Sequence, residues 1–342
     1  MTETEPRSQT VRTPRFASGG GFLGALGGHV RTWAPAVSLL VLVMAFGVAE
    51  PQFLGPNNLA TLASQAAIPI ILATGMSFVI LQGSIDLSVE GVMGASSLIF
   101  ALLVHNDRSG IDIGLLAIAA GALVGGAFGT LNGLLVTRLR IPSFMVTLGV
   151  WSFSSGVAML ISGGQPPRIL DMGMRTWALG NTGFLPNLAI VAVVFLAVGY
   201  VLQTYTRFGR YTFVIGGSEE IARLSGIGVD RFKVMAFAFC GLAAGLGAVF
   251  ESARLGLGHV EIGADQMFLT LTAVVIGGTS LGGGSGGVVQ SAVGVLILTV
   301  LANGMIFVGV TPYLQKAVQG MIILVAVTAT TWHLRSRLRV AK

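Results

Sequence analysis

The chain of 342 residues carries only 10% charged residues, while 53% of its residues are hydrophobic. A soluble domain carries about a quarter charged residues, so this composition excludes a soluble globular protein and predicts an integral membrane protein. The net charge of +6 does not indicate nucleic-acid binding here, because membrane proteins collect Lys and Arg in their cytoplasmic loops.

The N-terminal residues 1–33 are polar and rich in glycine, without a sustained apolar run. They are predicted to form a flexible cytoplasmic tail. A cleaved signal peptide is not expected, because the first apolar run begins late and no small-residue cleavage site follows it. A transmembrane domain is predicted over 34–334 and a basic cytoplasmic tail over 335–342.

A membrane-spanning helix needs about 20 mostly apolar residues, and ten segments fit this description. The eighth is short and interrupted by glycine. The segments cover about 34–50, 59–81, 86–105, 112–136, 142–162, 186–204, 233–255, 266–281, 286–305 and 314–332. The predicted fold is therefore an all-α integral membrane protein of about ten transmembrane helices, some broken by Gly-rich segments.

The basic residues predict the direction of the spans. If both termini are cytoplasmic, the inside segments hold fifteen Lys and Arg residues and the outside segments hold five. The positive-inside rule describes this asymmetry, which one span more or fewer would spoil. We therefore expect a multi-pass protein of the inner membrane with both termini in the cytoplasm.

The junction of the second and third spans, "LQGSIDLS" at 81–88, is polar. An acid inside a membrane is costly and usually faces a cavity or a partner, so Ser84 and Asp86 are candidates for lining a translocation path or fixing a gate. The alternative is that one of them caps the third span. In the fourth span, Asn132 and Thr137 offer either hydrogen bonds across helices or a contact to a solute.

The longest cytoplasmic loop, about 205–232, carries a predicted short helix. A small polar residue followed by acids is a helix start signal, and Gly226 suits the left-handed position after a helix. The helix has an apolar side that spans no membrane, so it is either a solvated connector or a docking surface for a cytoplasmic partner. Its residues are Glu219, Glu220, Ile221, Ala222, Arg223 and Leu224.

The segment "GGTSLGGGSGG" at 277–287 is a second break in the helical pattern. Segments 79–88 and 275–284 are weak counterparts, each an apolar run that ends in glycine and a hydroxyl residue. Interrupted helices in corresponding halves of a membrane protein favour a central pathway, which makes Thr279 and Ser280 further candidates for lining it. The alternative is close helix packing, which glycine also permits.

Four ordered stretches resemble one family of membrane proteins. "LQGSIDLSVEGVMG", "GTLNGLLVTRLRIPSFMVTLG", "TRFGRYTFVIGGSEEIARLSGIGVDRFK" and "AVVIGGTSLGGGSGG" are similar to segments of ribose/galactose/xylose-type permeases of ABC importers. "EEIARLSGI" resembles the coupling helix of such permeases. Glu90 departs from the family pattern, which has Gly or another small residue there.

The resemblance implies a permease subunit that forms the path for a monosaccharide, working as a homodimer or with a paralogue. An external binding protein would deliver the sugar, and a separate ATPase subunit would use the ATP. The chain carries no phosphate-binding GxxxxGK[ST] loop, so we expect a transport subunit that is not an enzyme and binds no cofactor itself.

Near the outer end of the seventh span, Glu251 and Arg254 are spaced to pair on one helix face, and the alternative role is a contact to the sugar. The residues His259, Glu261 and Asp265 suggest a polar rim where the binding protein lands. Neither a metal-ligand set nor a nucleophile–base pair is recognisable, which argues against a membrane enzyme. An ion-coupled secondary sugar transporter remains the alternative, although it would be expected to bury more ionisable residues in its spans.

Overall fold

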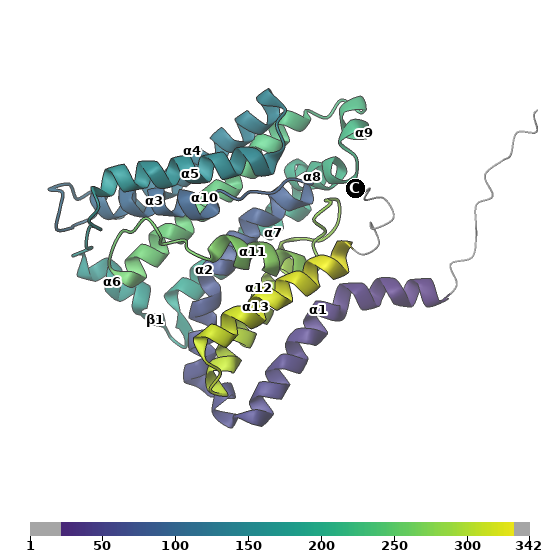
Figure 1. Ribbon diagram of the computed structural model, residues 1–342, viewed down its shortest axis with the longest axis horizontal. Helices are drawn as coiled ribbons and strands as arrows, with labels where there is room; N and C mark the ends of the chain where they lie inside the picture. The colour runs from purple at the N-terminus through teal and green to yellow at the C-terminus, as the bar shows by residue number, and fades with distance from the viewer. Residues whose placement is uncertain (1–21, 332–342) are drawn as a thin grey trace, which may run out of the picture.

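The computed structural model describes residues 22–331, which are almost entirely helical (Figure 1). Each of the ten predicted spans corresponds to a helix. The helices are α1 (Phe22–Ala49), α2 (Pro56–Leu81), α3 (Val89–Leu103), α4 (Leu116–Leu139), α5 (Ser143–Ser162), α7 (Asn187–Tyr205), α10 (Val229–Leu255), α11 (Gln266–Ile276), α12 (Val288–Phe307) and α13 (Pro312–Thr331). Six of them, α2, α4, α5, α7, α10 and α12, are each long and apolar enough to cross a membrane. The predicted all-α membrane fold is confirmed.

Shorter elements lie between the spans. They are the 3-10 helix η1 (Pro51–Leu54), α6 (Met172–Leu179), the antiparallel pair β1 (Asn181–Thr182) and β2 (Leu185–Pro186), α8 (Arg207–Gly217) and α9 (Glu219–Leu224). Figure 1 shows α6 and β1 at one end of the molecule and α8 and α9 at the other. We refer to these as the α6 end and the α9 end. The end of α13 lies toward the α9 end, as an even number of spans requires.

Two helices differ from their predicted bounds. Helix α1 begins at Phe22, so residues 22–33 are helical where a tail was predicted; apolar residues in that stretch are compatible with a helix. The remaining tail residues, 1–21 and 335–342, lie outside the described residues. Helix α1 changes direction along its length (Figure 1), and Pro35 inside it removes a backbone hydrogen bond. Helix α11 ends at Ile276, because Gly277 and Gly278 follow and Gly278 has a φ of +103°.

The centre of the bundle is built on small residues. A side chain on Gly125 or Gly129 of α4 would collide with the backbone of α10, and one on Gly241 of α10 would collide with the backbone of α4. Glycine at such positions lets two helices approach closely, which is how membrane helices pack without a hydrophobic driving force. In α2, 83% of the apolar stretch is buried, compared with 22% in α5 and α7. Helix α2 is therefore central, and α5 and α7 lie at the periphery.

Candidate coupling and translocation site

Helix α9 has a complete cap at each end. The hydroxyl of Ser218 accepts a hydrogen bond from the Ile221 N–H at 3.3 Å. At the other end Gly226 has a φ of +78°, its N–H donates to Arg223 O at 3.0 Å, and the Ile227 N–H donates to Ala222 O at 3.1 Å. These two bonds form a Schellman motif, which satisfies the last carbonyls of a helix. The predicted short helix and its left-handed glycine are confirmed.

The apolar residues of α9 do not share one side. Ile221 and Leu224 are 62% and 82% exposed, whereas Ala222 is fully buried and packs with Ile215 of α8 and Val229 of α10. The prediction that Ile221, Ala222 and Leu224 together form the apolar side of this helix is therefore wrong for Ala222. Residues three apart lie on the same helix face, while the residue after Ile221 is turned about 100° away. The exposed apolar pair is thus Ile221 and Leu224.

The charges of α9 tie it to the start of α10. Glu219 pairs with Lys233 at 2.5 Å and with Arg223 at 2.9 Å, and Arg223 also reaches Asp230 at 2.5 Å. Partial burial raises the pKa of Glu219, but the hydrogen bonds and charges of Lys233 and Arg223 outweigh that effect and lower the pKa overall. Glu220 is exposed. The side chains of Glu219 and Arg223 therefore hold α9 in place.

Helix α8 connects this unit to the membrane helices. The side-chain amide of Gln82, just after α2, donates to Thr212 Oγ1 of α8 and to Phe232 O of α10, both at 3.1 Å. The Gly284 N–H donates to Leu81 O at 2.9 Å. A side chain on Gly216 of α8 would overlap Leu81 O and lie against Gly284 N.

We call the meeting point of Leu81, Gly216 and Gly284 the glycine junction. It joins the end of α2, the end of α8 and the Gly-rich loop 277–287 through backbone atoms. The two broken segments that the sequence analysis paired are therefore in direct contact. The glycines of both segments allow close backbone packing, and this packing occurs where the helices are interrupted.

The segment 82–88 between α2 and α3 has no regular secondary structure, and side chains of α5 satisfy part of its backbone. The Ile85 N–H donates to Ser143 Oγ at 3.0 Å, and the Leu87 N–H donates to Thr147 Oγ1 at 3.0 Å. The two hydroxyl acceptors lie four residues apart on α5, a rise of about 6 Å along the helix. Backbone N–H groups outside regular structure need such partners where water is excluded. The sequence analysis missed Ser143 and Thr147.

Asp86 lies in this segment and is 1% exposed. One of its carboxylate oxygens accepts from the Ser88 N–H at 2.9 Å and from the Ser88 hydroxyl at 2.6 Å. Asn132 of α4 donates to Ser88 Oγ at 2.7 Å. The N-cap of α3 is Ser88, so capping by Asp86 or Ser84 is wrong, because the helix begins only at Val89 and Asp86 bonds to Ser88 instead. The predicted bond from Asn132 across helices is confirmed, whereas Thr137 bonds to Gly133 O of its own helix.

The other candidate path residues fall into two places. Ser84 lines a hollow of about 760 Å³ at the α9 end, together with Thr137, Ser143 and Lys233. Thr279 is buried and accepts from the Gly287 N–H at 3.1 Å, which closes the Gly-rich loop. Ser280 donates its N–H to Ser285 O within the same loop. Among the described residues, no hydrogen bond joins the Asp86 cluster to Thr279 or Ser280.

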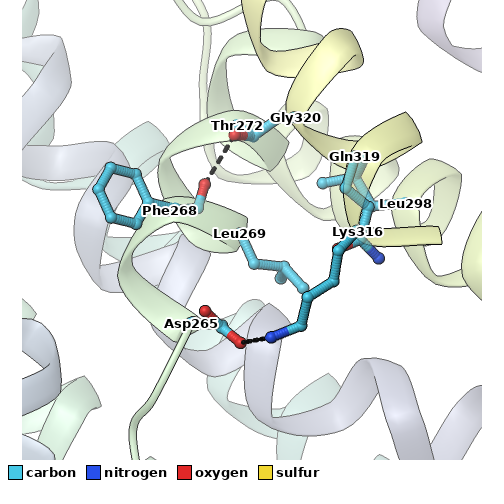
Figure 2. A pocket seen from close by; sticks show the side chains of 8 residues that line it. All are labelled: Asp265, Phe268, Leu269, Thr272, Leu298, Lys316, Gln319 and Gly320. Carbon is cyan, nitrogen blue, oxygen red and sulfur yellow. Dashed lines mark hydrogen bonds and ion pairs between the residues drawn. The ribbon is translucent and has the colours of Figure 1, made fainter. Parts of the chain in front are cut away.

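At the α6 end, the predicted pair of Glu251 and Arg254 is confirmed at 2.6 Å. Asp265 of the predicted rim pairs with Lys316 of α13 at 3.1 Å, and Figure 2 shows the lysine reaching across a pocket of about 240 Å³ beside Leu269. In the part of the chain that the structure describes, no three His, Cys, Asp or Glu residues form a candidate metal site.

Apolar spans interrupted by a non-helical segment and a Gly-rich loop, with two short helices between spans, are typical of a polytopic membrane transport protein. Residues 58–327 match the family described as branched-chain amino acid transport system / permease component. The chain belongs to this family of permeases.

Curated relatives place the chain among the permeases that the sequence motifs resemble. It is 36% identical to the ribose import permease protein RbsC of Escherichia coli (strain K12), over 85% of this chain and 91% of the relative. It is 32% identical to the probable ABC transporter permease protein YphD (95% and 94%) and 31% identical to the galactose/methyl galactoside import permease protein MglC (85% and 91%), both from the same strain. The resemblance is thus confirmed. No solved structure gives a significant match.

Proposed function

We propose that this chain is the permease subunit of an ATP-driven importer and forms the translocation path for a monosaccharide, ribose-like or related. The relatives named for ribose and galactose import support this substrate class. An external binding protein delivers the sugar, and a separate ATPase subunit supplies the energy. Two permease chains, identical or paralogous, form the pore in the inner membrane. The α9 end and both termini face the cytoplasm, in line with the basic residues there.

The observation that carries this proposal is the exposed apolar pair on a firmly attached helix. Ile221 and Leu224 face solvent, although α9 is held on its other side by Ala222 and by the Glu219–Lys233 ion pair. A soluble ATPase must pass its motion to the membrane helices through structure outside the bilayer. A short helix that moves together with α8 and α10 meets this need, and exposed apolar side chains are typical anchors for a partner.

An ion-coupled secondary transporter is the second candidate. The observation in its favour is Asp86, a buried acid within the membrane bundle. The two mechanisms differ in their energy source. Sugar uptake into vesicles that requires internal ATP and survives collapse of the ion gradient supports the importer, whereas the reverse result supports the secondary transporter.

The Leu224→Glu variant tests the docking role. Its side chain is 82% exposed, so we expect normal insertion and folded yield. The ATPase should co-purify at least tenfold less and uptake should fall with it, because burying a charge in an apolar contact is costly. Leu224→Met, which keeps the apolar surface, serves as the control and should retain both ATPase co-purification and sugar uptake. Normal ATPase recovery and uptake in Leu224→Glu would show that α9 is only a connector.

A further inference from the structure

An apolar groove of about 360 Å³ opens on the surface between α1, α7 and α12. Trp33 of α1, Tyr200 and Gln203 of α7, and Val289 and Val293 of α12 line it. The side chain of Trp33 is 63% exposed. In membrane proteins, exposed indole side chains are usually found at the interface between the hydrocarbon and the lipid head groups. The groove thus has the composition of a surface that faces lipid.

The aromatic pair at the end of α7 marks the edge of the membrane beside this groove. Tyr200 packs edge-to-face against Tyr205, with ring centroids 6.3 Å apart. Tyr205 is the last residue of α7 and is 69% exposed. Exposed tyrosines at the end of a span are typical of the membrane–water interface. Tyr200 belongs to both the groove and the pair, so the groove continues to this interface.

Two arginines follow directly after the tyrosine pair. Arg207 and Arg210 lie three residues apart on the exposed face of α8, while Phe208 and Thr212 face the protein. Within residues 33–331, neither guanidinium takes part in an ion pair. Guanidinium groups bind phosphate oxygens through paired hydrogen bonds, and arginines near a membrane surface attract acidic lipids.

We propose that the groove and the Arg207–Arg210 pair together bind one anionic phospholipid. An acyl chain lies in the groove against Trp33 and Tyr200, and the phosphate lies on the two guanidinium groups. A lipid suits this place better than an acidic protein segment, because the arginines begin two residues after the interfacial Tyr205, which packs against Tyr200 of the groove. A soluble partner would instead meet the exposed tip of α9.

The position of the site links it to the Gly-rich loop. Gln203, in the groove wall, accepts a hydrogen bond from the Val288 N–H at 2.8 Å and so holds the first turn of α12. Gly277, where the loop begins, also borders the groove. A lipid bound there would hold α7 and α12 together beside the loop. This inference depends on the membrane fold alone and not on the proposed transport cycle.

The test uses the purified full-length permease in detergent, stripped of lipid and titrated with phosphatidylglycerol or phosphatidylcholine of identical acyl chains. Native mass spectrometry counts the bound lipids. We expect the wild type to prefer phosphatidylglycerol and Arg207→Gln/Arg210→Gln to lose about 25-fold of this preference, since each arginine near the surface contributes roughly fivefold. Phosphatidylcholine binding should not change. Val289→Trp, at a half-exposed position in the groove, should lower the binding of both lipids.

Arg138→Gln/Arg231→Gln is the matched control, because it removes the same charge from two exposed residues outside the groove. It should keep the wild-type preference. An equal loss of phosphatidylglycerol preference in both double variants would show that the preference depends only on net charge. That result would contradict the proposed lipid site. Unchanged preference in Arg207→Gln/Arg210→Gln, with a loss of co-purifying ATPase, would assign the arginines to a protein partner and also overturn it.

Discussion

Gln82 and Thr212 are 130 residues apart in the chain, and Gln82 Nε2 lies 3.1 Å from Thr212 Oγ1. The same amide also reaches Phe232 O. One side chain at the end of α2 therefore connects the central, most buried span to α8 and to the start of α10. In the proposed importer, this amide is a direct side-chain link from α8 and the start of α10 to the centre of the bundle.

Replacing Gln82 with Leu should uncouple the two parts. The change leaves Phe232 O without this partner in a largely buried setting, which costs about 1–3 kcal/mol. We expect uptake to fall while the ATPase still co-purifies, because α9 itself is untouched. Gln52→Leu, at an exposed position in η1, is the control. Wild-type uptake in Gln82→Leu would argue against this route.

The cap of α9 predicts different effects at two neighbouring glycines. A side chain would meet nothing within 4 Å at Gly226 or at Gly228, but only Gly226 has a positive φ. Gly226→Val should therefore destabilise the α9 turn by about 1–2 kcal/mol and lower both ATPase recovery and uptake. Gly228→Val, at a φ of −72°, should be tolerated. Equal behaviour of the two variants in uptake assays would contradict the role of the left-handed turn.

The non-helical segment 82–88 should depend on the hydroxyl groups of α5. Ser143→Ala and Thr147→Val each remove the acceptor of a backbone N–H and should each lower stability by about 1–3 kcal/mol, measured as thermal unfolding in detergent. Thr147→Ser keeps the acceptor and should stay close to wild type. Ser152→Ala, on the exposed face of α5, should have no effect. Unchanged melting in both hydroxyl-deleted variants would show that water replaces these bonds.

The ion pairs of Glu219 give α9 a defined pH dependence. Because the pKa of Glu219 is lowered in the folded protein, its contribution is fully present above the unfolded value of about 4.3 and is lost as the pH falls through the lowered value. A spin label at Ser225 should thus keep one mobility from pH 8 down to the unfolded pKa and become mobile only at more acidic pH. In Glu219→Gln the label should be mobile throughout. A wild-type label that loosens near pH 6 would contradict this assignment.

The sequence predicts the spans well because apolar runs and glycine breaks are local signals. The start signal of α9 was also local, since Ser218, the two acids and Gly226 lie within one short stretch. Helix α8 was missed although its own N-cap, Thr206, and the buried Phe208, Thr212 and Ile215 at helical spacing stand in the sequence. Helix α8 is too polar and too short to span a membrane, so the sequence pattern predicts a loop there.

The candidate path residues show where sequence reasoning ends. Asp86 was recognised as unusual, yet its partners Ser88 and Asn132 are two and 46 residues away, and only the fold brings Asn132 to it. The same holds for Ser143 and Thr147, because only the fold brings their hydroxyl groups to the backbone of segment 82–88. Hydroxyl residues on an apolar helix give no signal of their own, because they bond equally well to their own backbone.

The glycine junction has a consequence for engineering. Gly216 has no room for any side chain because Leu81 O and Gly284 N occupy the space, and the three residues come from distant parts of the chain. The segment of α8 and α9 is therefore not an interchangeable adaptor. A chimera built to address a different ATPase would have to transplant the end of α2 and the Gly-rich loop along with α8 and α9. If family members diverged in their ATPase partners, these three segments would have had to change together.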